Sequence, residues 1–319
     1  MYRSKLISIA LAAASATALA GAGAAGATEV PNPPVPSTAP QVPIGGTTLP
    51  GGATPVPSGP ILIDACTVAE LVFPPLNRVT GTDQPDVLVG TPDRDLIRGL
   101  AGNDDIRGLG GNDVICAGDD NDHVAGGGGE DTIHGEGGRD TLVGSDDADH
   151  LYGGDEVDEI AGKAGDDYIE GGLDGDTVAG GAGLDELNGG GGGTTDFSVN
   201  RLDGGAGEDD VRGAAGNDIL RGGGGPDFML GFSGNDTFHG GAGRDDMRGS
   251  VGDDTLNGDG GDDRLEGDAD NDTLNGGFGV DKLWGDLLAG TGDDSLNGSA
   301  GVDAVCDGGP GANTIVNCP

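Results

Sequence analysis

"GSVGDDTLN", residues 249–257, stands between "GGAGRDDMR" (240–248) and "GDGGDDRLE" (258–266). All three stretches carry Gly at the first and fourth places, Asp at the sixth and one apolar residue at the eighth. The same nine-residue unit continues in both directions, and we count 24 copies over residues 81–306. Asp fills the sixth place in 23 copies, Asn200 being the exception, and the eighth place is apolar in all 24. A repeat of fixed period therefore organises most of the chain.

The array is interrupted twice. Twelve units follow one another over residues 81–188, and an insertion-bearing unit occupies 189–203. Nine further units fill 204–284, and a thirteen-residue unit and a final unit close a second block of 204–306. We expect these insertions to divide the repeat array into two or three segments.

The period itself predicts an all-β fold. One apolar residue between two variable ones suits a three-residue strand with a single inward side chain. The six Gly- and Asp-rich residues before it supply a turn, since Gly accepts positive φ without steric cost. Successive strands then lie in opposite sheets, so one coil takes eighteen residues and the chain winds into a flat parallel β-solenoid.

The stacked sixth-place carboxylates need a counter-ion. Neighbouring coils lie roughly 4.8 Å apart, and bare carboxylates at this spacing repel one another. Hard oxygen ligands without partnering His or Cys favour Ca²⁺ over zinc or copper. The repeat therefore predicts several Ca²⁺ ions between the coils.

Residues 81–306 resemble the RTX, or hemolysin-type, calcium-binding nonapeptide repeat, G-G-x-G-x-D-x-U-x. "GGAGRDDMR", "GGGGPDFML" (222–230) and "GGFGVDKLW" (276–284) match every fixed place. The resemblance implies a parallel β-roll in which Ca²⁺ ions bind between turns through backbone carbonyls and sixth-place Asp carboxylates. The implied ligands are Asp86, Asp104, Asp122, Asp140, Asp158 and Asp176 on one edge, and Asp95, Asp113, Asp131, Asp149, Asp167 and Asp185 on the other. After the first insertion, Asp209, Asp227, Asp245, Asp263 and Asp281 share one edge, Asp218, Asp236, Asp254 and Asp272 share the other, and Asp294 and Asp303 complete the set.

Some units depart from the pattern at the fourth place, where an acidic residue replaces Gly. Asp tolerates left-handed backbone better than most residues, so we expect these turns to survive. The units concerned carry Asp93, Asp120, Asp147, Glu156, Asp174 and Asp270.

Composition excludes several classes of partner and activity. The chain has 319 residues with 70 Gly, 56 acidic against 15 basic residues and a formal net charge of -41. This charge argues against nucleic acid and against a negatively charged membrane surface. No H-E-x-x-H, G-x-S-x-G, P-loop or C-x-x-C motif occurs, so we expect no enzyme. The seventh places of the first eight units, from Val87 to His150, form no row of Thr or Asn, so we expect no ice-binding face.

The N-terminal residues are typical of an exported protein. Residues 1–27 combine Arg3 and Lys5 with an uncharged stretch, and they predict a signal peptide cleaved after Ala27. A membrane anchor is the disfavoured alternative, because Ala and Gly dominate the segment. A Pro/Gly-rich linker (28–60) and an N-terminal cap (61–80) follow, and a C-terminal cap is expected at 307–319.

An oxidising compartment favours disulfides between the four cysteines. Four cysteines allow three connectivities. We favour the two local pairs, Cys66 with Cys116 and Cys306 with Cys318.

The sequence thus predicts a secreted, extracellular, monomeric calcium-binding protein that folds into a β-roll on binding many Ca²⁺ ions, without nucleic acid or membrane insertion. The alternative is an extracellular structural or adhesive matrix or surface protein in which calcium is only a folding ligand. A surface or matrix partner stays open under either hypothesis.

Overall fold

The computed structural model describes residues 77–190, 198–286, 292–301, 303 and 305–318. All of them lie within one compact unit, Gln41–Pro319. They form strands and turns, and none of them belongs to a helix that could cross a membrane. The predicted signal peptide, the linker and most of the N-terminal cap lie outside the described residues.

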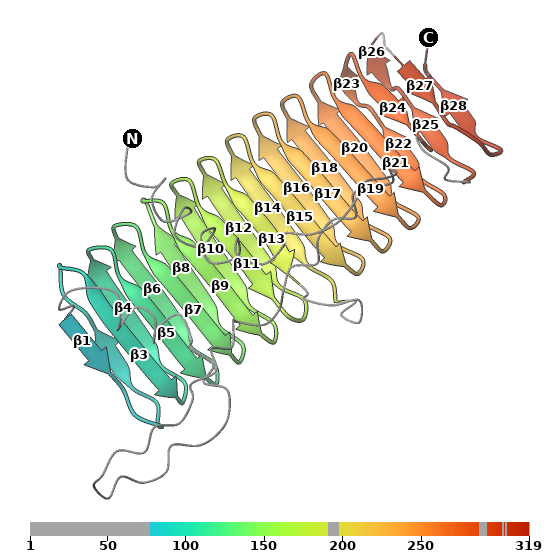
Figure 1. Ribbon diagram of the computed structural model, residues 1–319. Coiled ribbons are helices and arrows are strands. Elements are labelled where there is room, and N and C mark those ends of the chain that lie inside the picture. Colours follow the sequence, from blue (N-terminus) through green and yellow to red (C-terminus); the bar gives the residue numbers. More distant parts are fainter. Residues whose placement is uncertain (1–76, 191–197, 287–291, 302, 304, 319) are drawn as a thin grey trace, which may run out of the picture. The chain divides into compact units, whose positions relative to one another are not determined.

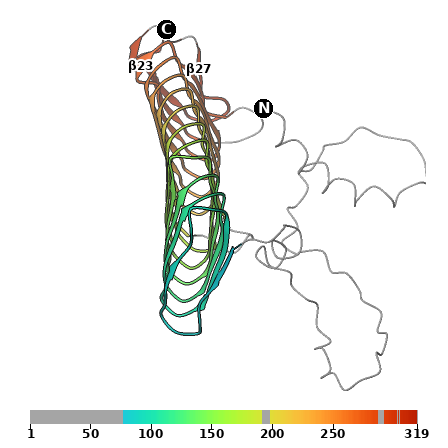
Figure 2. The ribbon, with the colours of Figure 1, turned by 90° about the vertical axis from the view of Figure 1, so that its left-hand side faces the viewer.

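The strands alternate between two parallel sheets, so that each coil contributes one strand to each (Figure 1). In one sheet Ile133 pairs with Ile115 and Leu151, eighteen residues away on either side. Leu142, one unit later, pairs in the other sheet with Val124. Figure 2 shows the coils as flattened loops stacked on one another. The predicted parallel β-roll with an eighteen-residue coil is confirmed.

The first of these sheets, sheet A, has thirteen strands. They are β1 (Asn77–Thr80), β3 (Asp95–Ala101), β5 (Val114–Asp119), β7 (Thr132–Gly137), β9 (His150–Asp155), β11 (Tyr168–Gly172), β13 (Glu186–Gly190), β15 (Asp210–Ala215), β17 (Phe228–Ser233), β19 (Asp246–Val251), β21 (Arg264–Ala269), β24 (Lys282–Trp284) and β27 (Val305–Asp307).

The opposite sheet, sheet B, has fifteen strands. They are β2 (Val87–Val89), β4 (Asp105–Gly110), β6 (His123–Gly128), β8 (Thr141–Ser145), β10 (Glu159–Ala164), β12 (Thr177–Ala182), β14 (Arg201–Ala206), β16 (Ile219–Gly224), β18 (Thr237–Ala242), β20 (Thr255–Gly260), β22 (Thr273–Asn275), β23 (Phe278–Gly279), β25 (Ser295–Asn297), β26 (Ala300–Gly301) and β28 (Thr314–Val316).

Both sheets continue across the two insertions. β12 pairs with β14 and β13 with β15 at the first insertion, and β22 pairs with β25 and β24 with β27 at the second. The expected division into segments is therefore wrong. The described strands on either side of each insertion keep the order that they have in the rest of the roll.

The strands are longer than the period suggested. Most run for six residues, from the seventh place of one unit to the third place of the next, so two places face inward instead of one. In β6 both Val124, at the eighth place, and Gly126, at the first place, are buried. A methyl group on Gly126 would lie 2.3 Å from Oδ2 of Asp131. Gly occupies the first place because the strand turns inward there against a carboxylate.

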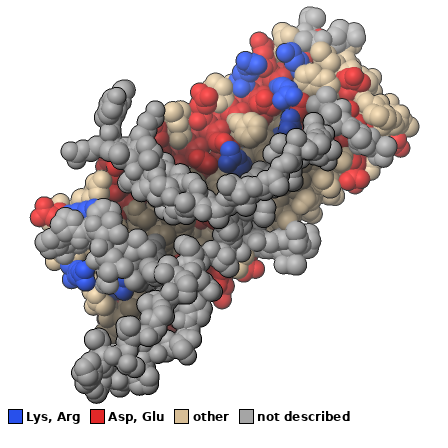
Figure 3. Space-filling view, viewed as in Figure 1, with Lys and Arg blue, Asp and Glu red and all other residues tan. Residues whose placement is uncertain are grey.

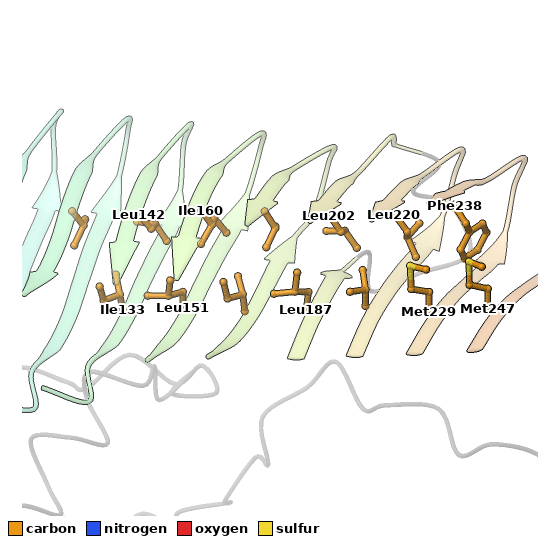
Figure 4. Close-up of a cluster of buried hydrophobic side chains, with 14 of the residues drawn as sticks. Ile133, Leu142, Leu151, Ile160, Leu187, Leu202, Leu220, Met229, Phe238 and Met247 are labelled. Carbon is orange, nitrogen blue, oxygen red and sulfur yellow. The ribbon is translucent and has the colours of Figure 1, made fainter. Parts of the chain in front are cut away.

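The core is a double row of the eighth-place side chains (Figure 4). From Ile97 to Leu296 each of these residues is no more than 1 % exposed. Sheet B supplies residues such as Leu142 and Phe238, and sheet A supplies residues such as Leu151 and Met247. Each buried aliphatic side chain contributes roughly 1.5–3 kcal/mol. Because each strand supplies one such side chain, the core is continuous along the roll but thin.

The ladder extends beyond both ends of the units counted in the sequence. β1 adds a rung at the N-terminal end, where Val79 packs against the core. β28 adds a rung at the other end, paired with β25. In β27 it is Cys306, not Val305, that pairs with Leu283, because one extra residue follows Asp303. Val305 is the eighth-place residue of its unit, so the expectation that every eighth-place residue faces the core is wrong here.

The two predicted disulfides have different outcomes. Cys306 and Cys318 are bonded to each other, which confirms the C-terminal pair. Cys116 is also disulfide-bonded, and its predicted partner Cys66 lies outside the described residues.

Candidate metal sites

The sixth-place side chains stand in two columns, one at the start of the strands of each sheet. The backbone N–H of Asp236 donates to Oδ1 of Asp254 at 2.8 Å, and that of Asp254 donates to Oδ1 of Asp272 at 2.9 Å. The same bond joins Asp185 to Asp209 across the first insertion at 2.9 Å. The column before sheet B contains Asp86, Asp104, Asp122, Asp140, Asp158, Asp176, Asn200, Asp218, Asp236, Asp254, Asp272 and Asp294. The column before sheet A contains Asp95, Asp113, Asp131, Asp149, Asp167, Asp185, Asp209, Asp227, Asp245, Asp263, Asp281 and Asp303.

These carboxylates are buried and only half satisfied. From Asp95 to Asp303 each sixth-place Asp is at most 4 % exposed, and only Asp86, near the N-terminal end, is half-buried. Oδ1 accepts the bond from the preceding coil, but in most of them Oδ2 has no hydrogen-bond partner. This oxygen is unpartnered in Asp104, Asp113, Asp122, Asp131, Asp140, Asp158, Asp167, Asp185, Asp209, Asp227, Asp236, Asp245, Asp254, Asp263, Asp272, Asp281, Asp294 and Asp303. A buried charged oxygen without a partner is costly, so these columns are suited to a cation.

The pKa values of these carboxyl groups are raised by the same burial. Burial raises the pKa of Asp254 to about 7, against the hydrogen bond from the Asp236 backbone, and the neighbouring Asp236 carboxylate adds to the rise. Burial likewise raises the pKa of Asp272 to about 8 and that of Asp245 to about 6. Without a cation, these groups therefore titrate much closer to neutral pH than an ordinary Asp does.

The carboxylates stand in single file and do not gather into cages. In the part of the chain that the structure describes, the one group of three close potential ligands is Asp303, Cys306 and Cys318. Its two sulfur atoms are joined in a disulfide, so they offer no thiolate ligands. A cation between two coils must take its remaining ligands from backbone carbonyls, which Ca²⁺ accepts readily.

The turns that flank the columns use left-handed backbone at the second and fourth places. Gly223 and Gly225, at these places of one unit, have φ of 111° and 132°. Fourth-place acids adopt the same region at Asp120, Glu156, Asp174 and Asp270, with φ between 69° and 84°. Asp93 and Asp147 do not, so the expectation that acidic residues keep the turn is confirmed for four of the six.

Fourth-place carboxylates also join neighbouring coils. Oδ2 of Asp120 accepts from the N–H of Gly102 at 3.2 Å, and Oδ2 of Asp147 accepts from the N–H of Gly129 at 2.8 Å. Each bond spans eighteen residues, which is one coil. These acids therefore stabilise the stacking of the turns directly.

A third ladder, at the fifth place, escaped the sequence analysis. Oδ1 of Asn235 accepts from the N–H of Asp253 at 3.1 Å, and Oδ1 of Asp253 accepts from the N–H of Asn271 at 2.9 Å. These bonds point from the later coil to the earlier one, opposite to the sixth-place bonds. The signal was a recurring Asn or Asp at a place that the repeat pattern leaves variable. The ladder runs through Asn217, Asn235, Asp253, Asn271 and Asp293 to the N–H of Ala312.

At one end of each column, Asn stands where a sixth-place Asp would lie. Asn77 precedes Asp95 in the column before sheet A, and Asn313 follows Asp294 in the column before sheet B. Asn77 donates through Nδ2 to Oδ1 of Asp95 at 2.6 Å. Asn313 accepts from the N–H of Asp294 at 2.7 Å and donates to the carbonyl of Gly309 at 3.0 Å. An amide supplies both an acceptor and its own donor, so it completes a column without a cation. Asn313 belongs to a unit that the sequence count did not include.

Several Arg side chains pair with acids on the outer faces of the sheets. Arg212 contacts Asp210 at 2.5 Å and Glu186 at 3.3 Å, and Arg248 contacts Glu266 at 2.5 Å. Figure 3 shows Lys and Arg gathered among carboxylates over the part of the roll that Figure 1 colours yellow to orange. The described Arg pairs therefore leave the charge of the two columns in place.

Comparison with known proteins agrees with this geometry. None of the curated proteins compared with the chain matches it. The family model of the RTX calcium-binding nonapeptide repeat matches residues 80–115, 117–151, 134–169, 152–187, 196–229, 212–247, 230–265, 257–287 and 286–315. These segments span both sheets and both columns. The chain, a parallel β-roll, therefore belongs to the RTX calcium-binding nonapeptide repeat family.

Proposed function

We propose that this protein is secreted and that its β-roll forms on Ca²⁺ ions held between successive coils along both edges. The observation that carries the proposal is the buried, unpartnered Oδ2 of the sixth-place aspartates, as in Asp254. The proposed ligands are the 23 sixth-place aspartates from Asp86 to Asp303, together with carbonyl oxygens of the turns. When bound, each ion supplies the positive charge that the columns otherwise lack.

The same chemistry makes calcium a folding ligand. The columns oppose folding when bare, and the core is only one side chain thick in each sheet. An ion that binds the folded chain alone adds its binding free energy to the stability of the fold. Extracellular calcium modules bind at roughly 10⁻⁴–10⁻³ M. The chain is therefore unfolded in a calcium-poor cytoplasm and folds after export.

Secretion is supported by the charged and apolar pattern of residues 1–27. The proposal assigns no catalytic activity, because the chemistry of the two columns is ion binding. A structural or adhesive role outside the cell is compatible with it, since calcium then serves the fold that presents the outer faces.

The test is a calcium titration of the full chain followed by far-UV circular dichroism, from chelator to about 10 mM, well above the affinity of extracellular modules. The expected result is a cooperative gain of β-structure with calcium and none with magnesium. Persistent disorder at saturating calcium, or β-structure indifferent to the chelator, would overturn the proposal.

A further inference from the structure

Two strands of sheet A carry a second apolar cluster, separate from the core. Leu96 in β3, and Val114 and Cys116 in β5, are each at most 7 % exposed. Their neighbours Ile97 and Ile115 belong to the double row of the core. Side chains alternate along a strand, so the three residues of this cluster point away from the core, onto the outer face of sheet A. An apolar cluster is thus buried on the outside of the roll.

Such burial is confined to this part of the outer face. Leu96 and Val114 occupy seventh places, and the described seventh places of sheet A from Thr132 to Lys282 are half-buried or exposed. On sheet B, at the same end of the roll, Val87 also occupies a seventh place and is 69 % exposed. The same residue type at the same place of the repeat is therefore open to water on one sheet and covered on the other.

A disulfide identifies what covers the cluster. Cys116 is disulfide-bonded, and Cys306 and Cys318 are bonded to each other. The chain has four cysteines, so Cys66 is the one that remains to pair with Cys116. The bond ties the segment around Cys66 to the cluster itself.

The sequence around Cys66 fits an apolar surface. Residues 61–73 read "ILIDACTVAELVF", in which Asp64 and Glu70 are the only charged residues. Transfer of such Ile, Leu, Val and Phe side chains from water onto an apolar surface is favourable. Leu96 and Val114 offer that surface beside the cysteine that the segment must reach.

The charges at the border of the cluster also match. Arg78 in β1 lies next to Leu96 in register, and Arg98 in β3 lies next to Cys116. These two cations stand in a chain whose net charge is -41. The two acids of residues 61–73 therefore have positive partners at this border, and complementary charge favours one register of docking.

The chain is long enough to return to β5. Cys66 stands eleven residues before Asn77, where β1 begins. β1 pairs with β3, and β3 pairs with β5, so the return crosses two rungs, roughly 10 Å. Eleven extended residues reach up to about 40 Å. The reach of the chain thus exceeds the distance that the disulfide requires.

We infer that residues 61–73 dock on the outer face of sheet A over β3 and β5, as a strap fixed by the Cys66–Cys116 disulfide. The strap joins the first rungs of sheet A from outside, through apolar contacts and one covalent bond. It therefore stabilises the N-terminal end of the roll without a calcium ligand. This inference goes beyond the proposed calcium binding and needs only the folded roll.

The experiment measures amide hydrogen exchange of residues 61–73 by mass spectrometry, with the full chain in calcium. Circular dichroism first verifies the β-structure, so that a chain that fails to fold contradicts the proposed function and not the strap. Mapping of unreduced peptides tests the link between Cys66 and Cys116.

The test variant is Val114→Asp, and its matched control is Val87→Asp, the same change at the same place of the repeat on the opposite sheet. Asp occupies seventh places of both sheets elsewhere, at Asp246 and Asp105, so the roll accommodates both changes. We expect slow exchange of residues 61–73 in the wild type and the control. In Val114→Asp, exchange should be faster by about tenfold or more, because the disulfide still tethers the segment but its apolar seat is lost.

Three results would overturn the inference. The first is exchange of residues 61–73 in the folded wild type at the rate of an unstructured chain, and the second is equal exchange in the two Asp variants. The third is a free thiol at Cys66 in the folded protein. Free exchange of the segment together with a dimer that Val114→Asp dissociates would assign the cluster to contact between two copies of the chain instead.

Discussion

Asp236 and Asp254 are joined by a hydrogen bond of 2.8 Å from the backbone N–H of the first to Oδ1 of the second, while Oδ2 of Asp254 is buried without a partner. One carboxylate thus has two separate tasks. Oδ1 holds the previous coil, which an amide oxygen does equally well. The charge at Oδ2 calls for a cation, which no amide replaces.

Asp158→Asn separates the two tasks. In the wild type, Oδ1 of Asp158 accepts from the N–H of Asp140 at 2.8 Å. The amide oxygen of Asn can accept the same bond, but the negative charge is lost. We expect the calcium-loaded roll to lose roughly 1.5–3 kcal/mol, the size of a charge-assisted contact. Urea unfolding in saturating calcium measures this loss. The control is Asp155→Asn, three residues away and exposed. Equal losses in Asp158→Asn and Asp155→Asn would contradict the assignment.

Gly222 stands at a first place and Gly224 at the third place of the same unit, so the pair tests why Gly recurs at the first place. A methyl group on Gly222 would lie 2.3 Å from Oδ2 of Asp227, whereas one on Gly224 meets nothing within 4 Å. Gly222→Ala should therefore destabilise the folded roll by roughly 1–3 kcal/mol. Gly224→Ala should stabilise it by roughly 0.4–1 kcal/mol through the unfolded chain. Urea midpoints of the two variants in saturating calcium measure both changes. Equal midpoints for Gly222→Ala and Gly224→Ala would contradict the steric explanation.

Acidification should stabilise the calcium-free roll. Burial raises the pKa of Asp254 and Asp263 to about 7, whereas an unfolded Asp titrates near about 3.9. Between these values the folded chain binds protons that the unfolded chain has released, so stability rises as the pH falls through this window and is lost as it rises through about 7. Far-UV circular dichroism of calcium-free protein at about pH 5 and about pH 7.5 measures the folded fraction at each pH. More β-structure at the higher pH would contradict it.

In calcium the expected trend reverses. Protons compete with the ion for the same carboxylates, so more calcium is needed for half-saturation as the pH falls. A calcium titration at the same two pH values provides this comparison. If the calcium concentration at half-saturation were independent of pH, protons would not compete with calcium for these carboxylates.

Phe238 and Phe278 provide a matched pair for the core. Phe238 is fully buried in the double row, and Phe278 is 73 % exposed. Phe238→Ala should cost about 3–5 kcal/mol, whereas Phe278→Ala should change the stability by less than about 0.5 kcal/mol. Thermal unfolding in saturating calcium measures both. A small loss at Phe238 would mean that the ions, not the apolar row, hold the coils together.

The period of the sequence was sufficient to predict the two sheets, the eighteen-residue coil and the two Asp columns. All three follow from one repeated pattern, in which the sixth and eighth places are almost invariant. The inward first-place Gly was missed because a residue without a side chain looks like part of a turn. Its position is decided by the carboxylate that lies against it, as Asp131 lies against Gly126.

Other features depended on which coils become neighbours. The fifth-place ladder appears only when every second unit is compared, since its members lie next to one another along the same edge. Cys306 takes the core position expected for Val305 because the chain has one extra residue there, which a nine-residue pattern does not reveal. Asn313 was missed because its unit lacks the Asp used to count repeats.

The alternation of strands between two sheets also limits how such a gene lengthens. Duplication of a single nonapeptide would send every later unit to the opposite sheet, whereas duplication of a pair leaves each unit in its own sheet. A block of three units behaves differently again. The acids at Asp93, Asp120, Asp147 and Asp174 recur every 27 residues, so consecutive copies fall on opposite edges. Amplification by threes therefore spreads new charge evenly over both sides of the molecule.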